Sequence, residues 1–240
     1  MEFLWQMLSQ AFNTIVDGDP ELYATLWRTM RFALIATAIA LVIGLPIALL
    51  LSSARSRGQR AGLLVANAGL GLPPVALGIY LGIALQPSWP LGGLRWSFTP
   101  QGVVLAQALL ALPIVVALSA AALRAVPEGL LDQARAFGAS RAAVAVLALR
   151  EARVGIIAAV IASLGSAIAE VGAVVIVGGN SSGVTNTLAS TVLLDLAAAN
   201  PSSAVADTLI LLAVLLVLAL ILTLVQRGRT PARAVKAFAR

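Results

Sequence analysis

Five long apolar segments divide the chain, and the stretches between them carry most of its charged residues. Each segment is more than 20 residues long, and about 20 apolar residues are enough for a helix to cross a bilayer. The pattern therefore predicts an all-α integral membrane protein with five transmembrane helices. We place the spans at approximately 29–51, 62–85, 100–123, 154–178 and 204–225.

The composition agrees with a membrane protein. Of the 240 residues, 60% are hydrophobic and 11% are charged, and the mean hydropathy is +0.98. A soluble domain is about half apolar and about a quarter charged, so a large soluble helical core is excluded. The chain has no cysteine and no histidine. Disulfide bonds are therefore excluded, and the commonest metal ligand and general base is missing. We predict no metal site and no catalytic residue.

The basic residues lie mostly on one side of the predicted spans. Of the 16 basic residues, 13 fall in the segments 52–61, 124–153 and 226–240, which share a side if the five spans alternate. Cytoplasmic loops carry an excess of Lys and Arg. We therefore predict an outer N-terminus, a transmembrane domain over 28–226 and a basic cytoplasmic tail over 227–240. The net charge of +6 needs no nucleic-acid partner.

The first 27 residues are predicted to form an outer interfacial segment. They lack a basic n-region and a cleavage signature, so they do not resemble a cleavable signal peptide. A helix lying on the outer leaflet is expected, followed by a break in which Asp19 caps the next helix and Pro20 takes its first position. The apolar residues near one face of this interfacial helix are Phe3, Leu4, Met7, Leu8 and Phe12, with Trp5 beside them.

Two further outer segments differ in kind. Residues 86–99 contain two tryptophans and two prolines, which is typical of turns in an interfacial aromatic belt. Residues 179–203 begin polar and then become helical, with a run over 187–199 that is too short and too polar to span. We expect this run to be a re-entrant or interfacial helix, because irregular backbone at membrane depth is tolerated only inside protein or along a cavity.

The longest cytoplasmic stretch, 124–153, predicts a helix, a glycine turn and a second helix. Leu130, Ala134 and Phe137 recur on one helical face, Gly138 interrupts, and Ser140 is placed to cap a helix over 141–149. A simple connector needs only a few residues. An amphipathic helix held outside the bilayer either docks into a groove on a partner protein or lies flat on the lipid surface.

The sequence "DQARAFGAS" within this stretch resembles the cytoplasmic loop signature of ABC importer permeases, which is Glu-Ala-Ala, three residues and Gly. Asp132 stands at the Glu position and Gly138 at the Gly position, whereas Gln133 departs from the first Ala. In that family the helix before the glycine is a coupling helix that fits a cleft in a separate ATPase subunit. The resemblance implies a coupling set of Leu131, Asp132, Ala134, Phe137, Gly138, Ala139, Ser140 and Arg141.

Further fragments occur in the order found in permeases of the tungstate transporter group, which the chain resembles over nearly its whole length. They are "GDPEL", "GLPPV", "ALPI", "AALR", "GASR", "LREAR.G", "EVGAV..VGGN" and "T.TL". One position departs from the pattern. That group usually carries an Arg between two threonines, and this chain has Asn186 between Thr185 and Thr187. The departure removes a cation from an oxyanion path and leaves the exact substrate open.

The resemblance implies a type I ABC importer permease in a bacterial or archaeal cytoplasmic membrane. Such a subunit works as a homodimer with a separate ATPase dimer, which uses ATP and Mg, and with an external oxyanion-binding protein. The chain has no Gly-x-x-x-x-Gly-Lys-Ser/Thr motif, so we expect no ATP hydrolysis and no cofactor in this chain itself. The implied substrate is tungstate, with molybdate or another small anion as the alternative.

Several residues within the spans are candidates for the transport path. Glu170 is the one acid well inside a span, where a charge costs roughly 2.5–3.5 kcal/mol. It is either a gate residue or a buried acid that hydrogen-bonds neighbouring helices. Pro73 and Pro74 lie mid-span and predict a helix kink, which either marks a transport site or is static. The full candidate set for the path or gate is Glu170, Gly172, Gly178, Asn180 and Thr187.

Two other classes of membrane protein fit the sequence less well. An intramembrane serine protease needs a His or Lys base, but the chain has no His and its single lysine, Lys236, lies in the tail. An aspartyl protease needs paired acids, and Glu170 stands nearly alone, with Asp207 at the edge of another span. An ion-driven carrier needs coupling acids near the midplane and usually inverted repeats, and the helix–glycine–helix loop would have no purpose in it.

Overall fold

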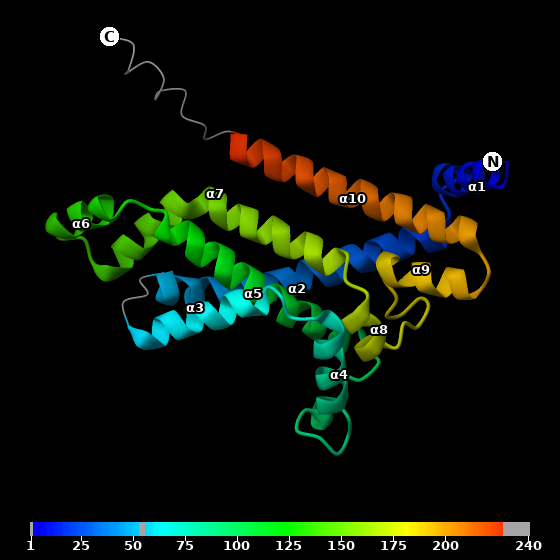
Figure 1. The fold of residues 1–240 in the computed structure, drawn as a ribbon, viewed down its shortest axis with the longest axis horizontal. Coiled ribbons are helices and arrows are strands. Elements are labelled where there is room, and N and C mark those ends of the chain that lie inside the picture. The colour runs from blue at the N-terminus through cyan, green and yellow to red at the C-terminus, as the bar shows by residue number, and fades with distance from the viewer. Residues whose placement is uncertain (1, 53–55, 228–240) are drawn as a thin grey trace, which may run out of the picture.

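The computed structural model describes residues 2–52 and 56–227, and every regular element in these ranges is helical. Figure 1 shows the helices gathered into one elongated bundle. The elements are α1 (Glu2–Val16), α2 (Pro20–Ser52), α3 (Arg57–Gly69), α4 (Pro74–Ala84), a 3-10 turn η1 (Gly92–Leu94), α5 (Pro100–Arg124), α6 (Glu128–Ala136), α7 (Arg141–Ile168), α8 (Gly172–Gly178), α9 (Leu188–Ala197) and α10 (Pro201–Arg227).

Three helices are long and apolar enough to cross a membrane unaided, namely α2, α5 and α10. Two bent pairs, α3 with α4 and α7 with α8, pass the same test only when each pair is taken as one crossing. The bends are 104° and 58° respectively. The described chain therefore holds three to five candidate spans, and the predicted number of five is reached when both bent pairs are counted as crossings.

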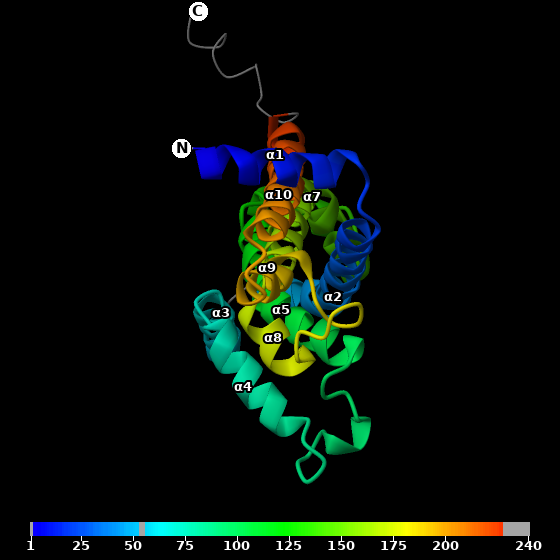
Figure 2. The ribbon, with the colours of Figure 1, turned by 90° about the vertical axis from the view of Figure 1, so that its right-hand side faces the viewer.

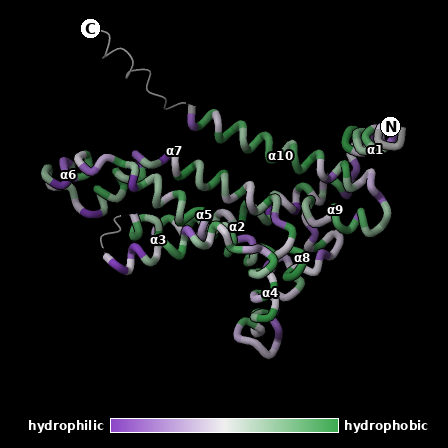
Figure 3. Tube along the Cα trace, in the orientation of Figure 1, coloured by the Kyte–Doolittle hydropathy of each residue, from purple (hydrophilic) through white to green (hydrophobic). Residues whose placement is uncertain are grey.

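Helix α5 forms the centre of the bundle. It packs most extensively against α2 and α7, and it also contacts α3, α4 and α8. More than half of the residues in its most apolar 18-residue stretch are buried, whereas none of the residues in the corresponding stretch of α10 is buried. Many apolar side chains of α10 are exposed, among them Leu212, Leu216 and Leu220, and Figure 3 shows that most of the α10 trace is hydrophobic. Outward apolar side chains are expected where the surrounding medium is lipid.

The break between α3 and α4 contains the two prolines predicted to kink the second span. Helix α3 ends at Gly69, Pro73 precedes α4, and Pro74 takes the first position of α4. The prolines therefore separate two helices instead of bending one continuous helix. Proline suits the first position of a helix because its missing N–H would have no intrahelical partner there.

The chain turns between α1 and α2 as predicted, but the predicted limit of the membrane domain at residue 28 does not coincide with that turn. The Asp19 carboxylate accepts hydrogen bonds from the backbone N–H groups of Glu21 and Leu22 at 3.0 and 2.9 Å, which confirms the predicted cap of α2. Helix α2 then runs without interruption past residue 27, so the predicted domain boundary falls inside a helix.

Helix α1 lies across the end of α10 (Figure 2) and packs its buried Ala11 against that helix. A stripe of apolar side chains on α1 stays exposed: Trp5, Leu8, Phe12 and Val16. The side chains of Phe3 and Leu4, the residues 53–55 and the tail after Arg227 lie outside the described part of the chain. The outer interfacial location of α1 stays a prediction.

Candidate functional site

The stretch 124–153, predicted to be cytoplasmic, folds as a helix, a turn and a second helix at one end of the bundle (Figure 1). Helix α6 ends at Ala136, and Gly138 has a φ of +83°, in the left-handed region that glycine adopts at little cost. The Ser140 hydroxyl then accepts a hydrogen bond from the Ala143 N–H at 3.2 Å and caps α7. The predicted second helix is not separate, because α7 continues into the fourth predicted span.

Helix α6 presents an apolar residue that nothing in the described chain covers. Phe137, which caps the carboxyl end of the helix, is 91% exposed, whereas Leu131 packs against the core cluster formed by α2, α3, α5 and α7. Asp132 and Arg135 form an ion pair on the exposed surface. An exposed aromatic side chain held on a rigid helix is typical of a surface that binds another protein. Of the other predicted coupling residues, Ala134 and Ala139 are half-buried, and Gly138, Ser140 and Arg141 are exposed.

A second group of polar residues lies at the break between α7 and α8. Glu170 is 8% exposed, and its carboxylate accepts a hydrogen bond from the Ala173 N–H at 2.9 Å, at the start of α8. The acid is thus located between two helices and caps the second of them. The geometry matches the interpretation of Glu170 as a buried acid that bonds its neighbours.

Gln107 supports the same break from the centre of the bundle. Its amide Nε2 donates to the Ala167 carbonyl at 2.9 Å, and the side chain is fully buried. The Ala167 carbonyl also accepts the Glu170 N–H at 3.4 Å, so Gln107 adds a bond from α5 to the last turn of α7. Gln107 was not among the predicted residues. The signal was an amide in the interior of an apolar segment that has only one other, Gln101 near its start.

Two glycines of the predicted path are explained by close packing. A Cβ on Gly172 would lie 2.7 Å from Val75 Cγ2, and a Cβ on Gly178 would lie 2.5 Å from Val103 Cγ2. These positions hold α8 tightly against α4 and α5. The glycines therefore allow helices to approach one another, and neither has a positive φ.

The segment from 179 to 187 is an irregular loop with buried polar side chains. Asn180 donates to the Ser190 carbonyl at 3.0 Å. Thr187 caps α9, with its hydroxyl accepting from the Ser190 N–H at 3.4 Å. Thr185 donates to the Gly178 carbonyl at 2.7 Å. Asn180 and Thr187 thus hold the loop together through their own side chains.

Asn186 is also used within the loop. Its side-chain oxygen accepts from the Gly183 N–H at 3.0 Å, and its amide nitrogen donates to the Thr191 hydroxyl at 2.8 Å. The side chain is 1% exposed. Asn186 is therefore a structural residue of the loop, with both ends of its amide occupied.

Helix α2 contacts this loop at three points. Arg28 Nε donates to the Asn186 carbonyl at 2.8 Å, and Arg28 Nη2 donates to the Thr25 hydroxyl at 2.9 Å. The Thr29 hydroxyl accepts from the Leu188 N–H at 2.8 Å. Ser182 donates to the Glu21 carboxylate at 3.1 Å. The contacts between helix and loop join residues about 160 positions apart in sequence, and no local pattern predicted them.

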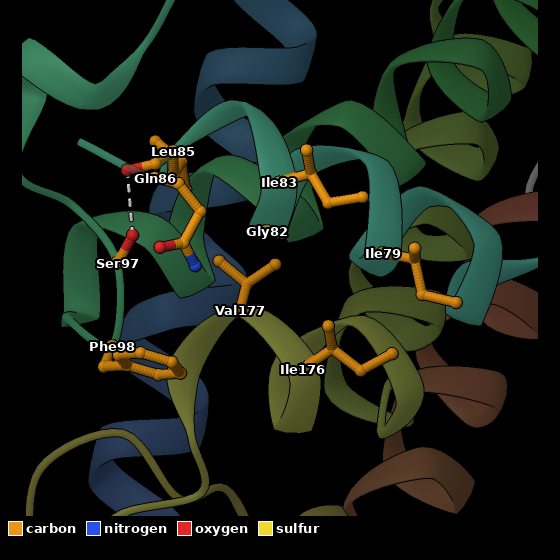
Figure 4. Close-up of a pocket in the computed structure, with 9 residues that line it drawn as sticks. All are labelled: Ile79, Gly82, Ile83, Leu85, Gln86, Ser97, Phe98, Ile176 and Val177. Atoms are coloured by element: carbon orange, nitrogen blue, oxygen red, sulfur yellow. Dashed lines mark hydrogen bonds between the residues drawn. The ribbon is translucent and has the colours of Figure 1, made fainter. Parts of the chain in front are cut away.

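A separate apolar cavity lies between α4 and α8, and Figure 4 shows its lining. Its volume is about 220 Å³. Ile79 and Ile83 come from α4, and Ile176 and Val177 from α8, while Phe98 lies at one side. The Ser97 hydroxyl is bonded to the Leu85 carbonyl at 3.0 Å. No charged side chain lines this cavity, so it does not suit an oxyanion.

Metal ligands are also not gathered anywhere in the residues that the structure describes. No group of three or more His, Cys, Asp or Glu side chains there could hold a metal ion. The polar and charged groups discussed above lie in the stretch 124–153 and in the loop between α8 and α9, and they offer hydrogen bonds and charge.

Comparison with known proteins assigns the family. Residues 24–230 match the binding-protein-dependent transport system inner membrane component, which covers most of the chain. The chain belongs to this family of ABC transporter permeases, which are multi-pass proteins of the inner membrane. The assignment from the loop signature is thereby confirmed, and the protease and carrier alternatives are set aside. The family is the membrane component of the transporter and not its ATPase.

Several curated relatives are similar over most of the chain. A probable anion ABC transporter permease protein of Haloferax volcanii is 38% identical, with 75% of this chain and 80% of the relative covered. The tungstate uptake system permease protein TupB of Peptoclostridium acidaminophilum is 28% identical, covering 80% and 84%. The molybdenum transport system permease protein ModB of Azotobacter vinelandii is 33% identical, covering 69% and 77%.

Solved structures share the fold. The MetNI methionine ABC transporter, in an inward-facing conformation, aligns with a TM-score of 0.64 and 19% identity over 85% of this chain and 95% of that chain. An amino acid ABC transporter solved with histidines aligns with a TM-score of 0.64 and 18% identity, covering 90% and 98%. The helical architecture is that of type I ABC importer permeases, as the sequence predicted.

Proposed function

Because the chain belongs to this family of importer membrane components, we propose that it is the permease subunit of an ATP-driven importer for tungstate. Molybdate is the next candidate. The support comes from its relatives, which are named as anion, tungstate and molybdenum permeases. A tetrahedral oxyanion is a substrate class that fits all three names.

The subunit works as a homodimer with a separate ATPase pair and an external binding protein. One chain offers one helix α6, and a dimeric ATPase offers two clefts, so two copies are needed to engage both. The N-terminus lies outside and the C-terminus lies in the cytoplasm, since the stretches 52–61, 124–153 and 226–240 carry most of the basic residues.

Transport follows alternating access. A loaded binding protein docks on the outer loops, and ATP closes the ATPase pair. The two copies of α6 then move with their ATPase subunits, and the path opens outward to receive the anion. Hydrolysis returns the dimer to a form that faces the cytoplasm. ATP and Mg belong to the ATPase partner, and the permease contributes the path and the mechanical link.

The observation that carries the proposal is the orientation of α6. Leu131 packs against the bundle and ties the helix to it, while Phe137 is 91% exposed at the carboxyl end of the same short helix. A force applied at Phe137 therefore reaches α7 through a rigid element. An uncovered aromatic side chain of this kind fits an apolar cleft on a partner protein.

The experiment is co-purification of the ATPase subunit encoded with this permease. We expect the wild type to retain the ATPase in mild detergent and Phe137→Asp to lose it, because a carboxylate would be buried in an apolar cleft. Leu94→Asp is the matched control. Leu94 is an exposed apolar residue in the α4–α5 connection, and its substitution is expected to leave the complex intact.

Retention of the ATPase by Phe137→Asp would refute α6 as the coupling helix and would favour a location of that helix on the lipid surface. Uptake of tungstate, molybdate and sulfate by vesicles containing the assembled transporter then identifies the substrate. Preference for sulfate over both metal oxyanions would refute the assignment to tungstate.

A further inference from the structure

Arg28 is an unusual cation in this membrane protein. Only three of the 16 basic residues, Arg28, Arg31 and Arg95, lie on the predicted outer side. Arg31 is exposed, whereas Arg28 is half-buried between α2 and the loop that follows α8. Arg28 lies in α2, one residue before the predicted span 29–51, and its half-buried charge has lost part of its hydration.

Arg28 forms no ion pair with a carboxylate of the described residues. Its two hydrogen bonds go to neutral acceptors, the Asn186 carbonyl and the Thr25 hydroxyl. Glu21, the one acid on the same helix, attracts Arg28 electrostatically without forming an ion pair with it. It lies seven residues away, which corresponds to about 10 Å of helical rise, and its carboxylate already accepts a bond from Ser182.

The guanidinium keeps most of its bonding capacity. An arginine side chain has five N–H donors, and the bonds to Asn186 and Thr25 use two of them. Both N–H groups of Nη1 remain, together with one on Nη2. The bond from Nε to the Asn186 carbonyl fixes the plane of the group, so the remaining donors are held in place before any ligand arrives.

The surroundings of Arg28 are polar and lie at a break in the helical structure. The loop it contacts follows α8 and precedes α9, and its polar side chains Thr185, Asn186 and Thr187 are at most 1% exposed. In membrane transporters, irregular backbone at depth occurs inside protein or beside a water-filled cavity, and broken helices mark binding sites. These side chains are buried and bonded within the loop, so the accessible polar group here is the half-buried guanidinium of Arg28.

We propose that Arg28 binds the transported oxyanion as it passes the loop between α8 and α9. The inference rests on the proposed function, because it takes the cargo to be an oxyanion. A planar guanidinium can bond two oxygens of a tetrahedral anion at once, which a lysine ammonium does less well. Asn186 has no such role, since both ends of its amide are bonded within the loop.

The test compares Arg28→Gln with Arg28→Lys in vesicles that contain the assembled transporter and the loaded binding protein. The quantity measured is tungstate transported per ATP hydrolysed, because the binding protein dominates the apparent KM. We expect Arg28→Gln to lower this ratio about tenfold, the effect of losing one charge-assisted contact. Arg28→Lys, which keeps the charge, is expected to retain more than Arg28→Gln does.

Arg31→Gln is the matched control, since Arg31 is an exposed arginine about one turn further along α2. It is expected to transport as the wild type does. A merely structural role of Arg28 predicts no advantage of Arg28→Lys over Arg28→Gln, because the glutamine amide nitrogen takes the position of Nε and can still donate to the Asn186 carbonyl. If Arg28→Gln transports as well as Arg28→Lys or better, the proposal is wrong.

The proposed function and this inference fail in different ways. If the wild type co-purifies with the ATPase but transports no oxyanion, the substrate class is wrong and the role of Arg28 falls with it. If the wild type transports tungstate and the ratio is unchanged in Arg28→Gln, the substrate stands and only the role of Arg28 is refuted. Co-purification of the ATPase with each variant shows whether that variant has folded.

Discussion

Replacement of Glu170 separates a gating role from a structural one. The carboxylate bridges the break between α7 and α8 by accepting the Ala173 N–H at 2.9 Å, in a position that is 8% exposed. Glu170→Ala removes this acceptor and leaves a buried N–H without a partner. A lost helix cap costs about 0.5–2 kcal/mol, and an unsatisfied buried donor costs about 1–3 kcal/mol. From these two ranges we expect a loss of about 2 kcal/mol in stability.

Glu170→Gln retains an acceptor oxygen of the same reach and removes only the charge. The hydrogen bond to Ala173 can therefore persist, and we expect a thermal midpoint close to that of the wild type. Thermal unfolding of the purified complex, followed by size-exclusion chromatography in detergent, measures both variants. Asp17→Ala, at an exposed carboxylate near the start of the chain, is the control for loss of an acid alone.

The reasoning is refuted if Glu170→Ala unfolds at the same temperature as the wild type, because the hydrogen bond would then carry no stability. A different result identifies a gate. If Glu170→Gln is as stable as the wild type but no longer transports anion, the charge itself is needed during the cycle. The capping bond would then be only one of two roles for this residue.

Two further predictions concern packing and pH. Gly178→Val forces side-chain atoms against Val103, because a Cβ at this position would already lie 2.5 Å from Val103 Cγ2. We expect a loss of about 1–3 kcal/mol of stability in the same unfolding assay. The control, Gly129→Val, should lose far less stability, because nothing lies within 4 Å of a Cβ there. Burial raises the pKa of the Asp195 carboxyl, which shares a hydrogen bond with Asp207. The folded state then binds more protons than the unfolded state, and stability falls as pH rises above the ordinary carboxyl range. Asp195→Asn should therefore unfold at a higher temperature than the wild type at pH 8, with the difference shrinking toward acid; a difference that grows toward acid would contradict this sign.

The sequence predicted the features that depend on local chemistry. Apolar length located the straight spans α2, α5 and α10. The Asp19 cap of α2 and the Ser140 cap of α7 follow from short-range preferences, and both hydrogen bonds are present. The turn at Gly138 is equally local, since it needs only one residue that tolerates a positive φ.

The breaks in the spans were harder to predict. Adjacent prolines indicated a bend before α4, but they did not indicate that α3 and α4 would be separate helices with an angle of 104° between them. The break between α7 and α8 contains no proline and interrupts an apolar run that is long enough to form one span. Next to this break, Gln107 donates to the Ala167 carbonyl, a bond that joins positions 60 residues apart. Periodicity within a segment carries no information about such a partner.

In the loop after α8, the charged side chain lies at a different sequence position from the one that the motif indicates. The resemblance to permeases of the tungstate transporter group led us to expect an arginine between Thr185 and Thr187, and Asn186 in its place predicted the loss of a cation from the oxyanion path. Asn186 instead turns its side chain inward to Gly183 and Thr191, and its carbonyl accepts the Nε of Arg28 at 2.8 Å. The positive charge at the loop therefore comes from α2, 158 residues earlier in the chain. If Arg28 binds the transported oxyanion as proposed, it supplies the charge that is absent at position 186, and this relation depends on the packing of α2 against the loop.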